Sequence, residues 1–194
     1  MHYHAEVYVP PNTTDLEAFV KEAMAPHHEE YHDEVHNSFW DWYQIGGRWT
    51  GEKDPNYDPT KDPQNAEECR LCLGTGFRND PQGVQSRSED QTYTCNGCGK
   101  YDETTKTWGH TNIGPGRSVK WPTEWAKFKG DIMPISVVPR DLKCFTLIVG
   151  DQVFHQEAWN GDDFVKTEFD GLVIPKLKEL EINDGHLVTV DYHT

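Results

Sequence analysis

Several features that would assign a protein to a class at once are missing from this 194-residue sequence. No apolar run is long enough to cross a membrane, and the first residues have neither the basic nor the apolar region of a signal peptide. We therefore expect neither a membrane protein nor a secreted one. The sequence also has no glycine-rich phosphate loop, nucleophile elbow or dinucleotide fingerprint, so none of these catalytic classes is predicted.

Positive charge is scarce. Lysine and arginine number 18 against 33 aspartate and glutamate residues, which gives a formal net charge of −15 at pH 7. Phosphate backbones and anionic lipid surfaces repel such a chain, so neither nucleic acid nor a membrane is expected as a partner. A basic protein partner would fit this charge. The alternative is that the protein is acidic without having such a partner. Apolar residues make up only 35%, but 7 Trp, 8 Tyr and 8 Phe supply large side chains for a core.

Cysteine is rare as well, but four of the five cysteines form two Cys-x-x-Cys pairs. Cys69 with Cys72 and Cys95 with Cys98 predict a structural Zn²⁺ site, because four thiolates in two such pairs complete a tetrahedral coordination sphere. A catalytic zinc would need an open position, which four cysteines do not leave. Disulfide bonds are the alternative, but Cys144 would be left over. Free thiols and the absence of a secretory segment predict a reducing, cytoplasmic location.

The N-terminal part of the chain shows two clear periodic patterns. Residues 2–9 alternate between polar and apolar side chains, which indicates a half-buried strand. A helix is expected to follow, with Thr13 or Thr14 as its N-cap and Glu17 completing a capping box. Residues 39–50 are aromatic and predict a further strand that bends at a pair of glycines.

The C-terminal part predicts a hairpin, a helix and a closing strand. Gly150-Asp151 lies between two apolar runs and predicts a tight turn in a hairpin over residues 144–158. A second helix is expected to begin at Asp162 or Asp163. Residues 187–193 alternate again and predict the last strand.

These elements follow the order strand, helix, strand, hairpin, helix, strand once the middle of the chain is set aside. This order predicts an α+β fold, specifically a ferredoxin-like sandwich with an inserted zinc ribbon. Residues 1–51 and 120–194 would form the sandwich, and residues 52–119 a linker plus the zinc-binding insert. The first and last strands would then be antiparallel neighbours, with their polar face pointing away from the helices.

The paired chain ends would bring four functional side chains together on that polar face, namely His2, His4, Asp191 and His193. Three imidazoles and a carboxylate can hold a divalent ion or act as a general acid–base set. These residues are the catalytic candidates. The alternative is a solvated sheet face with exposed terminal histidines.

Residues 41–49 hold an aromatic segment with charged side chains. An arginine between aromatic rings can bind a phosphate or a carboxylate, so Asp41 and Arg48 are candidate ligand-binding residues. The alternative is a structural Arg–Asp pair. Further upstream, residues 28–32 match the His-Glu-x-x-His pattern of zinc metalloproteases. This pattern is short and no long apolar helix carries it, so a protease is not favoured.

Seven short segments are distributed over nearly the whole chain: residues 24–29, 40–49, 69–76, 95–99, 120–123, 130–134 and 190–193. In this order they resemble a family of small proteins of actinobacterial phages and their hosts, for which no activity is established. The cysteine pairs are also similar to half of the zinc region of DnaJ-type chaperones. At Tyr192 the family often has cysteine instead. The resemblance implies a protein that acts in the cytoplasm of a bacterial host.

The sequence favours a zinc-binding phage-type accessory protein that binds a host or phage macromolecule, for example in host takeover or defence inhibition. Its partner would be a protein. The alternative is a metal-dependent hydrolase or nucleotide-binding enzyme that uses the His/Asp cluster at the chain ends. Because no complete catalytic set is evident, the enzyme is the less favoured hypothesis. A redox-responsive zinc switch, which would release its metal under mild oxidation, is a third.

Overall fold

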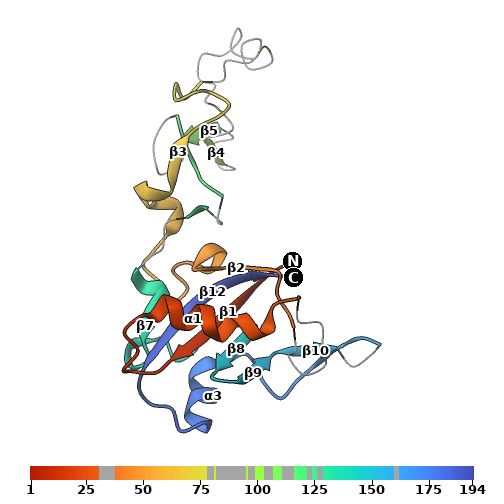
Figure 1. Ribbon diagram of the computed structural model, residues 1–194. Helices are drawn as coiled ribbons and strands as arrows, with labels where there is room; N and C mark the ends of the chain where they lie inside the picture. Colours follow the sequence, from red (N-terminus) through yellow and green to blue (C-terminus); the bar gives the residue numbers. More distant parts are fainter. Residues whose placement is uncertain are drawn as a thin grey trace. The chain divides into compact units, whose positions relative to one another are not determined.

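The chain separates into two compact units in the computed structural model (Figure 1). The first unit consists of residues 1–57 and 127–194, and the second of residues 58–126. The structure describes residues 1–30, 38–77, 81, 95, 99–102, 107–110, 116–121, 124–125, 129–159 and 162–194. Residues 52–57, which the sequence assigned to the linker, belong to the first unit, and residues 120–126 belong to the second.

The first unit consists mostly of strands. They are β1 (His2–Val9), β2 (Trp42–Ile45), β7 (Ile132–Pro134), β8 (Thr146–Val149), β9 (Gln152–His155), β10 (Glu157–Trp159), β11 (Phe164–Lys166) and β12 (His186–His193). Its helices are α1 (Leu16–Met24) and α3 (Val173–Glu179), with short 3₁₀ turns η1 (Ala25–His27), η2 (Gly47–Trp49), η6 (Lys129–Asp131) and η7 (Ile135–Val137). Among the described residues, no helix combines the length and apolar character needed to cross a membrane.

One mixed sheet organises this unit. Its strands follow the order β2-β12-β1-β8-β9, and β7 also pairs with β12. The two central strands, β1 and β12, are antiparallel, whereas β1 and β8 are parallel. A separate two-stranded sheet is formed by β10 and β11. The predicted α+β class is therefore confirmed.

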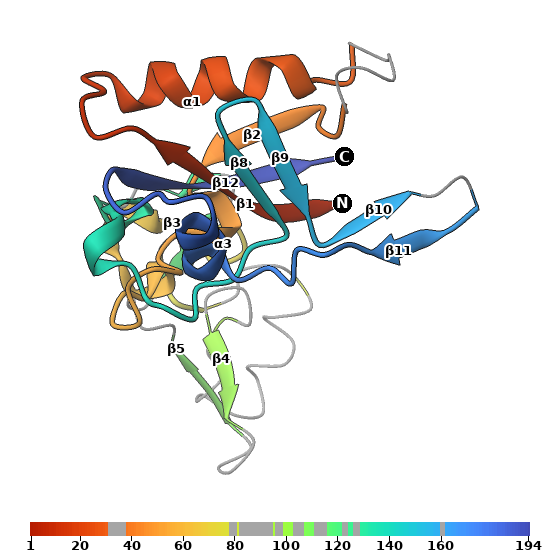
Figure 2. The same cartoon turned by 90° about the horizontal axis from the view of Figure 1, so that it is seen from below.

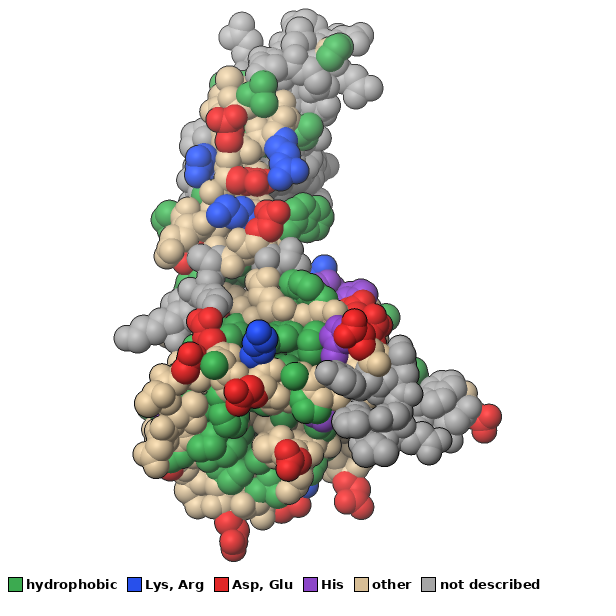
Figure 3. All heavy atoms as spheres, in the orientation of Figure 1, with side chains coloured by type: hydrophobic (Ala, Val, Ile, Leu, Met, Phe, Trp, Pro, Cys, Tyr) green, Lys and Arg blue, Asp and Glu red, His purple; other side chains and the backbone are tan. Residues whose placement is uncertain are grey.

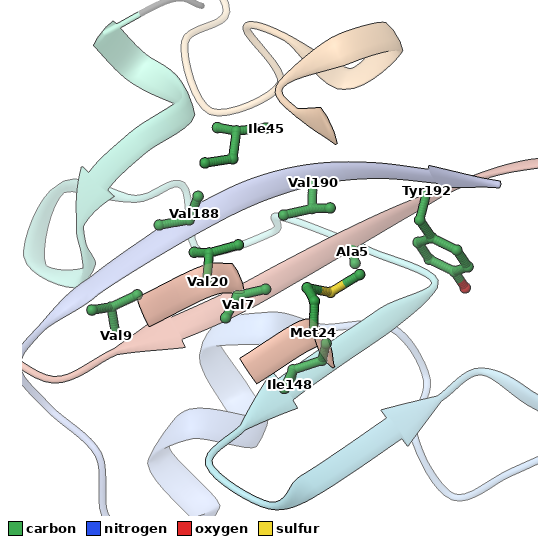
Figure 4. Packing of buried hydrophobic residues seen from close by; sticks show 10 residues of the cluster. All are labelled: Ala5, Val7, Val9, Val20, Met24, Ile45, Ile148, Val188, Val190 and Tyr192. Atoms are coloured by element: carbon green, nitrogen blue, oxygen red, sulfur yellow. The ribbon is translucent and has the colours of Figure 1, made fainter. Parts of the chain in front are cut away.

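Helix α1 covers one face of the sheet (Figure 2). Alternate residues of β1 point to this face, so that Ala5, Val7 and Val9 are buried against Val20 and Met24 of α1 (Figure 4). Strands β8 and β12 add the buried side chains Ile148, Val188, Val190 and Tyr192. This core accounts for the alternating pattern of the first and last strands.

Helix α3 covers part of the opposite face. It buries Val173 and Leu177 against Leu147 of β8 and Leu187 of β12, and Tyr8 of β1 packs beside them. Leu147 and Leu187 directly precede residues of the first core, and consecutive strand residues point to opposite faces of a sheet. The two helices therefore lie on opposite sides of the sheet (Figure 2).

The predicted ferredoxin-like arrangement is not confirmed. An α+β sandwich of that kind has an antiparallel sheet with its helices segregated on one face. Here the sheet is mixed, because β8 pairs with β1 in parallel. Because the helices also lie on opposite faces, the polar face of β1 does not point away from both of them, as the sequence suggested. The antiparallel pairing of the first and last strands is present as expected.

Several predicted elements form where the sequence placed them, and one does not. The strand over residues 2–9, the hairpin around Gly150-Asp151 and the closing strand are confirmed. The helix expected from Asp162 or Asp163 is wrong, because residues 164–166 form β11. Phe164 is 63% exposed, so this apolar segment does not face a core.

The cap of the first helix also differs from the prediction. Asp15 is the N-cap of α1, and its carboxylate accepts a hydrogen bond from the backbone N–H of Ala18 at 3.0 Å. Aspartate is at least as effective an N-cap as threonine. Because Asp15 takes this position, α1 begins at Leu16, after both candidate threonines.

Among its described residues, the second unit contains two small sheets. Strand β3 (Ala66–Glu68) pairs with β6 (Arg117–Val119), and β4 (Gly99–Asp102) pairs with β5 (Thr107–His110), both antiparallel. The short 3₁₀ turns η3 (Pro59–Lys61) and η4 (Pro63–Asn65) precede β3. The described residues of this unit form one buried cluster, which consists of three cysteines.

Candidate functional site

Three of the predicted zinc ligands lie together in the second unit. Cys69, Cys72 and Cys95 are buried, and their Sγ atoms all lie within 4.8 Å of one another. The Sγ atoms of Cys69 and Cys95 are 3.7 Å apart, too far for a disulfide bond of about 2.05 Å. Two thiolates on a tetrahedral zinc, each about 2.3 Å from the ion, would be about 3.8 Å apart. The three thiols therefore fit a metal site, while Cys98 lies outside the described residues.

The backbone explains how the thiols converge. The N–H groups of Leu73 and Thr75 donate to the carbonyls of Cys69 and Cys72, which makes a tight turn after the first pair. The N–H of Cys95 donates to the carbonyl of Gly76 at 2.8 Å. This bond attaches the start of the second pair directly to the end of the first turn.

The turn after the first pair has a left-handed backbone at three positions. Gly74 and Gly76 have φ values of 78° and 79°, which glycine adopts without steric cost. Leu73 has a φ of 49° and its side chain is 65% exposed. The glycines that the sequence places after the first pair thus permit the turn that brings Cys95 to it.

The fifth cysteine is separate from this cluster. Cys144 is buried in the core that α3 covers, and burial raises the pKa of its thiol well above the usual value. Such a thiol stays protonated near neutral pH and is a poor metal ligand. The four described cysteines thus divide into a cluster of three that could hold a metal ion and one residue of the hydrophobic core.

The chain ends bring the predicted histidine cluster together. In the pairing of β1 with β12, His2 lies opposite His193, and His4 lies opposite Asp191. The rings of His2 and His193 are in edge contact, with centroids 5.3 Å apart. The four residues are therefore neighbours on one face of the sheet, as the predicted pairing of the first and last strands implies.

Each of these histidines nevertheless has its own acidic partner. His2 Nδ1 lies 2.9 Å from Asp191 Oδ1, and His4 Nε2 lies 2.9 Å from Glu6 Oε1. His193 Nδ1 pairs instead with Asp41, at 2.8 Å from Oδ1. Among the described residues, only the three cysteines bring three metal-binding side chains within 4.8 Å of one another. The histidines are thus held in separate pairs that do not converge on one ion.

A buried polar network lies beneath His4. Glu6 is fully buried, and its Oε1 accepts a hydrogen bond from Thr189 Oγ1 at 2.8 Å. Its Oε2 forms an ion pair with Lys53 Nζ at 2.9 Å. The Lys53 ammonium also donates to the backbone carbonyls of Asp131 and Leu187, both at 2.8 Å. These contacts join β1, β12 and the segment after η2.

Two opposing effects set the charge of this ion pair. Burial by itself raises the pKa of Glu6, but the Lys53 ammonium and the bond to His4 outweigh it and lower that pKa. Burial lowers the pKa of Lys53, and Glu6 opposes that change. Three acceptors around Nζ require three N–H donors, which only the ammonium form has. Glu6 and Lys53 therefore form an ion pair in which both groups are charged and each is held by buried partners.

No short sequence pattern indicates this network. Lys53 lies in the segment that the sequence predicts to be a linker, and Asp131 belongs to no motif. Glu6 shares the polar face of the first strand with His2 and His4, which was the only available signal. A lysine and a carboxylate that lie far apart in sequence pair only when the fold brings them together.

The two predicted ligand-binding residues are not brought together as a pair. Asp41 contacts His193, and this hydrogen bond lowers the pKa of its carboxyl group. The side chain of Arg48 is exposed, and it is the backbone N–H of Arg48 that donates to Asp191 Oδ2, at 3.0 Å. A structural Asp41–Arg48 pair, the alternative interpretation, is therefore wrong.

The described part of the metalloprotease-like segment is not helical. η1 ends at His27, and His28 has an extended backbone with φ −68° and ψ 144°. Its ring packs against Trp40, with centroids 4.5 Å apart. His32, the second histidine of the pattern, lies outside the described residues. The helix that would place two histidines on one face does not include His28.

Comparisons of the chain with protein-family models, with curated proteins and with solved structures found no match in any of the three. The resemblance to the phage family therefore stays a prediction. The function is inferred from the geometry of the chain's own residues.

Proposed function

We propose that this chain is a non-enzymatic zinc-binding protein that acts by binding a macromolecule, in the manner of a phage accessory protein in a bacterial cytoplasm. Cys69, Cys72, Cys95 and Cys98 would hold one structural zinc ion, and the second unit would be a zinc ribbon. The observation that carries the proposal is the cluster of three buried thiols with a 3.7 Å spacing between Cys69 and Cys95.

The structural role of the ion follows from what surrounds it. The buried cluster formed by the described residues of the second unit is the cysteine cluster itself, without aliphatic side chains. A unit of this kind gains its stability from metal ligation, because the ion replaces a hydrophobic core. Four thiolates leave no position for a substrate, so the zinc would support a binding surface rather than a reaction.

A catalytic role for the histidine cluster has less support. His2, His4 and His193 are each paired with a different carboxylate. A second metal ion would need at least two of these pairs to open. The acidic composition and the absence of a catalytic motif agree with a binding protein that has a basic partner.

Metal analysis of the purified chain tests this proposal. We expect about one zinc ion per chain, which Cys69→Ser or Cys95→Ser removes. Cys144→Ser is the matched control, because it replaces a buried cysteine outside the cluster and should retain the ion. Zinc that survives Cys95→Ser would contradict the structural site. A second ion that survives it and disappears with His4→Ala would favour the enzyme.

The binding role has its own test. The zinc-loaded full chain is immobilised and exposed to host lysate, and a stoichiometric macromolecular partner is expected. If none is recovered while the chain itself is recovered intact, the binding role is wrong even if the zinc is present.

A further inference from the structure

A cleft of about 510 Å³ opens in the first unit. Its lining comes from the ends of β1, β9 and β12, from residues 38–41 before β2, and from the β10–β11 sheet. Tyr3 and Tyr192 belong to the hydrophobic core that α1 covers. The cleft therefore lies on the same face of the sheet as α1. It is separate from the cysteine cluster and from the Glu6–Lys53 network.

Aromatic rings form the bed of the cleft. Tyr3 lies between Phe145 and Tyr192, with ring centroids 4.7 and 5.5 Å away. Phe39 meets Tyr192 edge-on at 5.1 Å. At the margin, Phe164 on β11 is 63% exposed and also lines the cleft. Tyr192 itself is buried, whereas Tyr3, Phe39 and Phe145 are partly exposed and line the cleft. Aromatic surface that stays exposed in this way can contact a cationic side chain.

The polar groups in contact with these rings carry no charge near neutral pH. Thr146 Oγ1 lies 2.8 Å from the Tyr192 hydroxyl and 2.9 Å from His155 Nδ1. Burial lowers the pKa of His155 to about 4, with His27 contributing, so its imidazole is neutral. Burial also raises the pKa of Tyr192, which keeps its phenol protonated. These three side chains therefore satisfy one another by hydrogen bonding and place no positive charge in the cleft.

The rim of the cleft is acidic. Glu29, Asp41 and Glu157 are exposed carboxylates among the lining residues, and the described lining includes no lysine or arginine. Asp41 is held anionic by its bond with His193, which lies beside the rim. On the visible face of the first unit, acidic side chains greatly outnumber basic ones (Figure 3). An aromatic bed under several carboxylates attracts a cation through both its rings and its charges.

We propose that this cleft is the docking site for an arginine or lysine side chain presented by a segment of a partner protein. The inference rests on the proposed function, since it names the chemistry of the partner that the chain would bind. The carboxylates would pair with the cationic group of that side chain. The exposed ring of Phe164 and the aromatic bed would contact its methylene chain and, for arginine, the flat guanidinium. Nucleic acid and anionic lipid do not match, because the rim would repel their phosphates.

A peptide titration tests the site. The probe is acetyl-Gly-Gly-Arg-Gly-Gly-amide, and its partner probe has citrulline, a neutral isostere, in place of arginine. Both are added to the isotope-labelled, zinc-loaded full chain and followed by NMR. The arginine peptide should shift the signals of Tyr3, Phe39 and Phe164 saturably, and the citrulline peptide should bind about tenfold more weakly.

Charge-matched variants locate the binding. Glu29→Gln with Glu157→Gln removes two rim carboxylates and should weaken arginine binding roughly three- to tenfold. Glu22→Gln with Asp151→Asn removes two exposed carboxylates outside the cleft and should change the affinity less than about twofold. All four positions are exposed, so both variants should fold. Phe164→Ala should weaken binding without changing the net charge.

The outcomes separate this inference from the proposed function. Equal binding of the arginine and citrulline peptides, or equal loss in the rim variant and its control, would overturn the cation site. If that happens while zinc and a macromolecular partner are both found, only the cleft assignment fails. Peptide binding at the cleft of a chain that holds no zinc would instead support the cleft and contradict the structural metal.

Discussion

At the scale of single residues, Lys53 shows how the first unit tolerates a charge in its interior. The side chain is 3% exposed, and Nζ has three oxygen acceptors at 2.8–2.9 Å: the carbonyls of Asp131 and Leu187 and the Glu6 carboxylate. Isolated ions in a protein interior are costly, and this cost is offset only when every donor and acceptor is satisfied. The ammonium meets that condition here.

We predict that Lys53→Met destabilises the protein by about 3–5 kcal/mol, because it leaves the Glu6 carboxylate buried without its counter-charge and two carbonyls without a donor. Urea unfolding of the zinc-loaded chain, followed through the tryptophans of the first unit, measures the change. Lys166→Met is the matched control. Lys166 is exposed on β11, so the same substitution there should cost less than about 0.5 kcal/mol. Equal effects of the two substitutions would mean that the buried ion pair adds no stability.

At the scale of elements, the turn that follows β2 fixes the polar end of the sheet. Gly46 and Gly47 have φ values of 78° and 59°, so both are left-handed. The turn brings the N–H of Arg48 to Asp191 Oδ2, which leaves Asp191 bound on one side by this backbone and on the other by His2. The close approach of Gly47 to Asp191 leaves no room for a side chain, which is the reason for the glycine pair.

Gly47→Ala should therefore destabilise the first unit by about 2–4 kcal/mol, since it combines left-handed strain with steric overlap. A Cβ at this position would lie 2.5 Å from Asp191 Oδ2. Gly150→Ala separates the two effects. Gly150 has a similar φ of 58°, but a Cβ added there would have no neighbour within 4 Å, so only the strain of about 1–2 kcal/mol is expected. Thermal unfolding of both variants checks the difference, and a cost at Gly47 no larger than at Gly150 would contradict the close approach.

Elements with a strong local signal are also those that sequence analysis predicts well. The alternation of residues 2–9 specifies a strand because one face is buried under α1, and Gly150-Asp151 specifies a hairpin turn. Phe164 and Val165 are apolar as well, but they lie on β11, where both side chains are exposed. Apolar side chains alone did not reveal whether that segment meets a core.

At the scale of the whole molecule, the two units rely on different stabilising interactions. The first unit buries two hydrophobic clusters, one beneath each helix. The buried cluster among the described residues of the second unit is made of Cys69, Cys72 and Cys95. A metal ion would therefore matter to one unit and not to the other.

We predict that a zinc chelator such as 1,10-phenanthroline unfolds the second unit and leaves the first folded, because no cysteine of the cluster belongs to the first unit. NMR spectra should lose the dispersed signals of β3 and β6 and retain those of β1 and β12. Added zinc should restore the lost signals. Loss of the β1 and β12 signals at the same chelator concentration would show that the first unit also depends on the metal.

The amino-acid sequence alone was enough to specify the features that depend on short spacings. Cys-x-x-Cys pairs place two thiols on one tight turn, alternation places Val7 and Val190 on a buried face, and the excess of acidic residues sets the charge. Each of these follows from local backbone geometry or from simple counting.

Which distant side chains meet was settled by the three-dimensional fold. It placed Lys53 against Glu6, paired Asp41 with His193 rather than with Arg48, and arranged aromatic rings and carboxylates from separate elements around one cleft. The physical reason is that such contacts depend on strand order, register and the face that each helix covers. These are determined by packing over the whole unit, and short sequence patterns do not encode them.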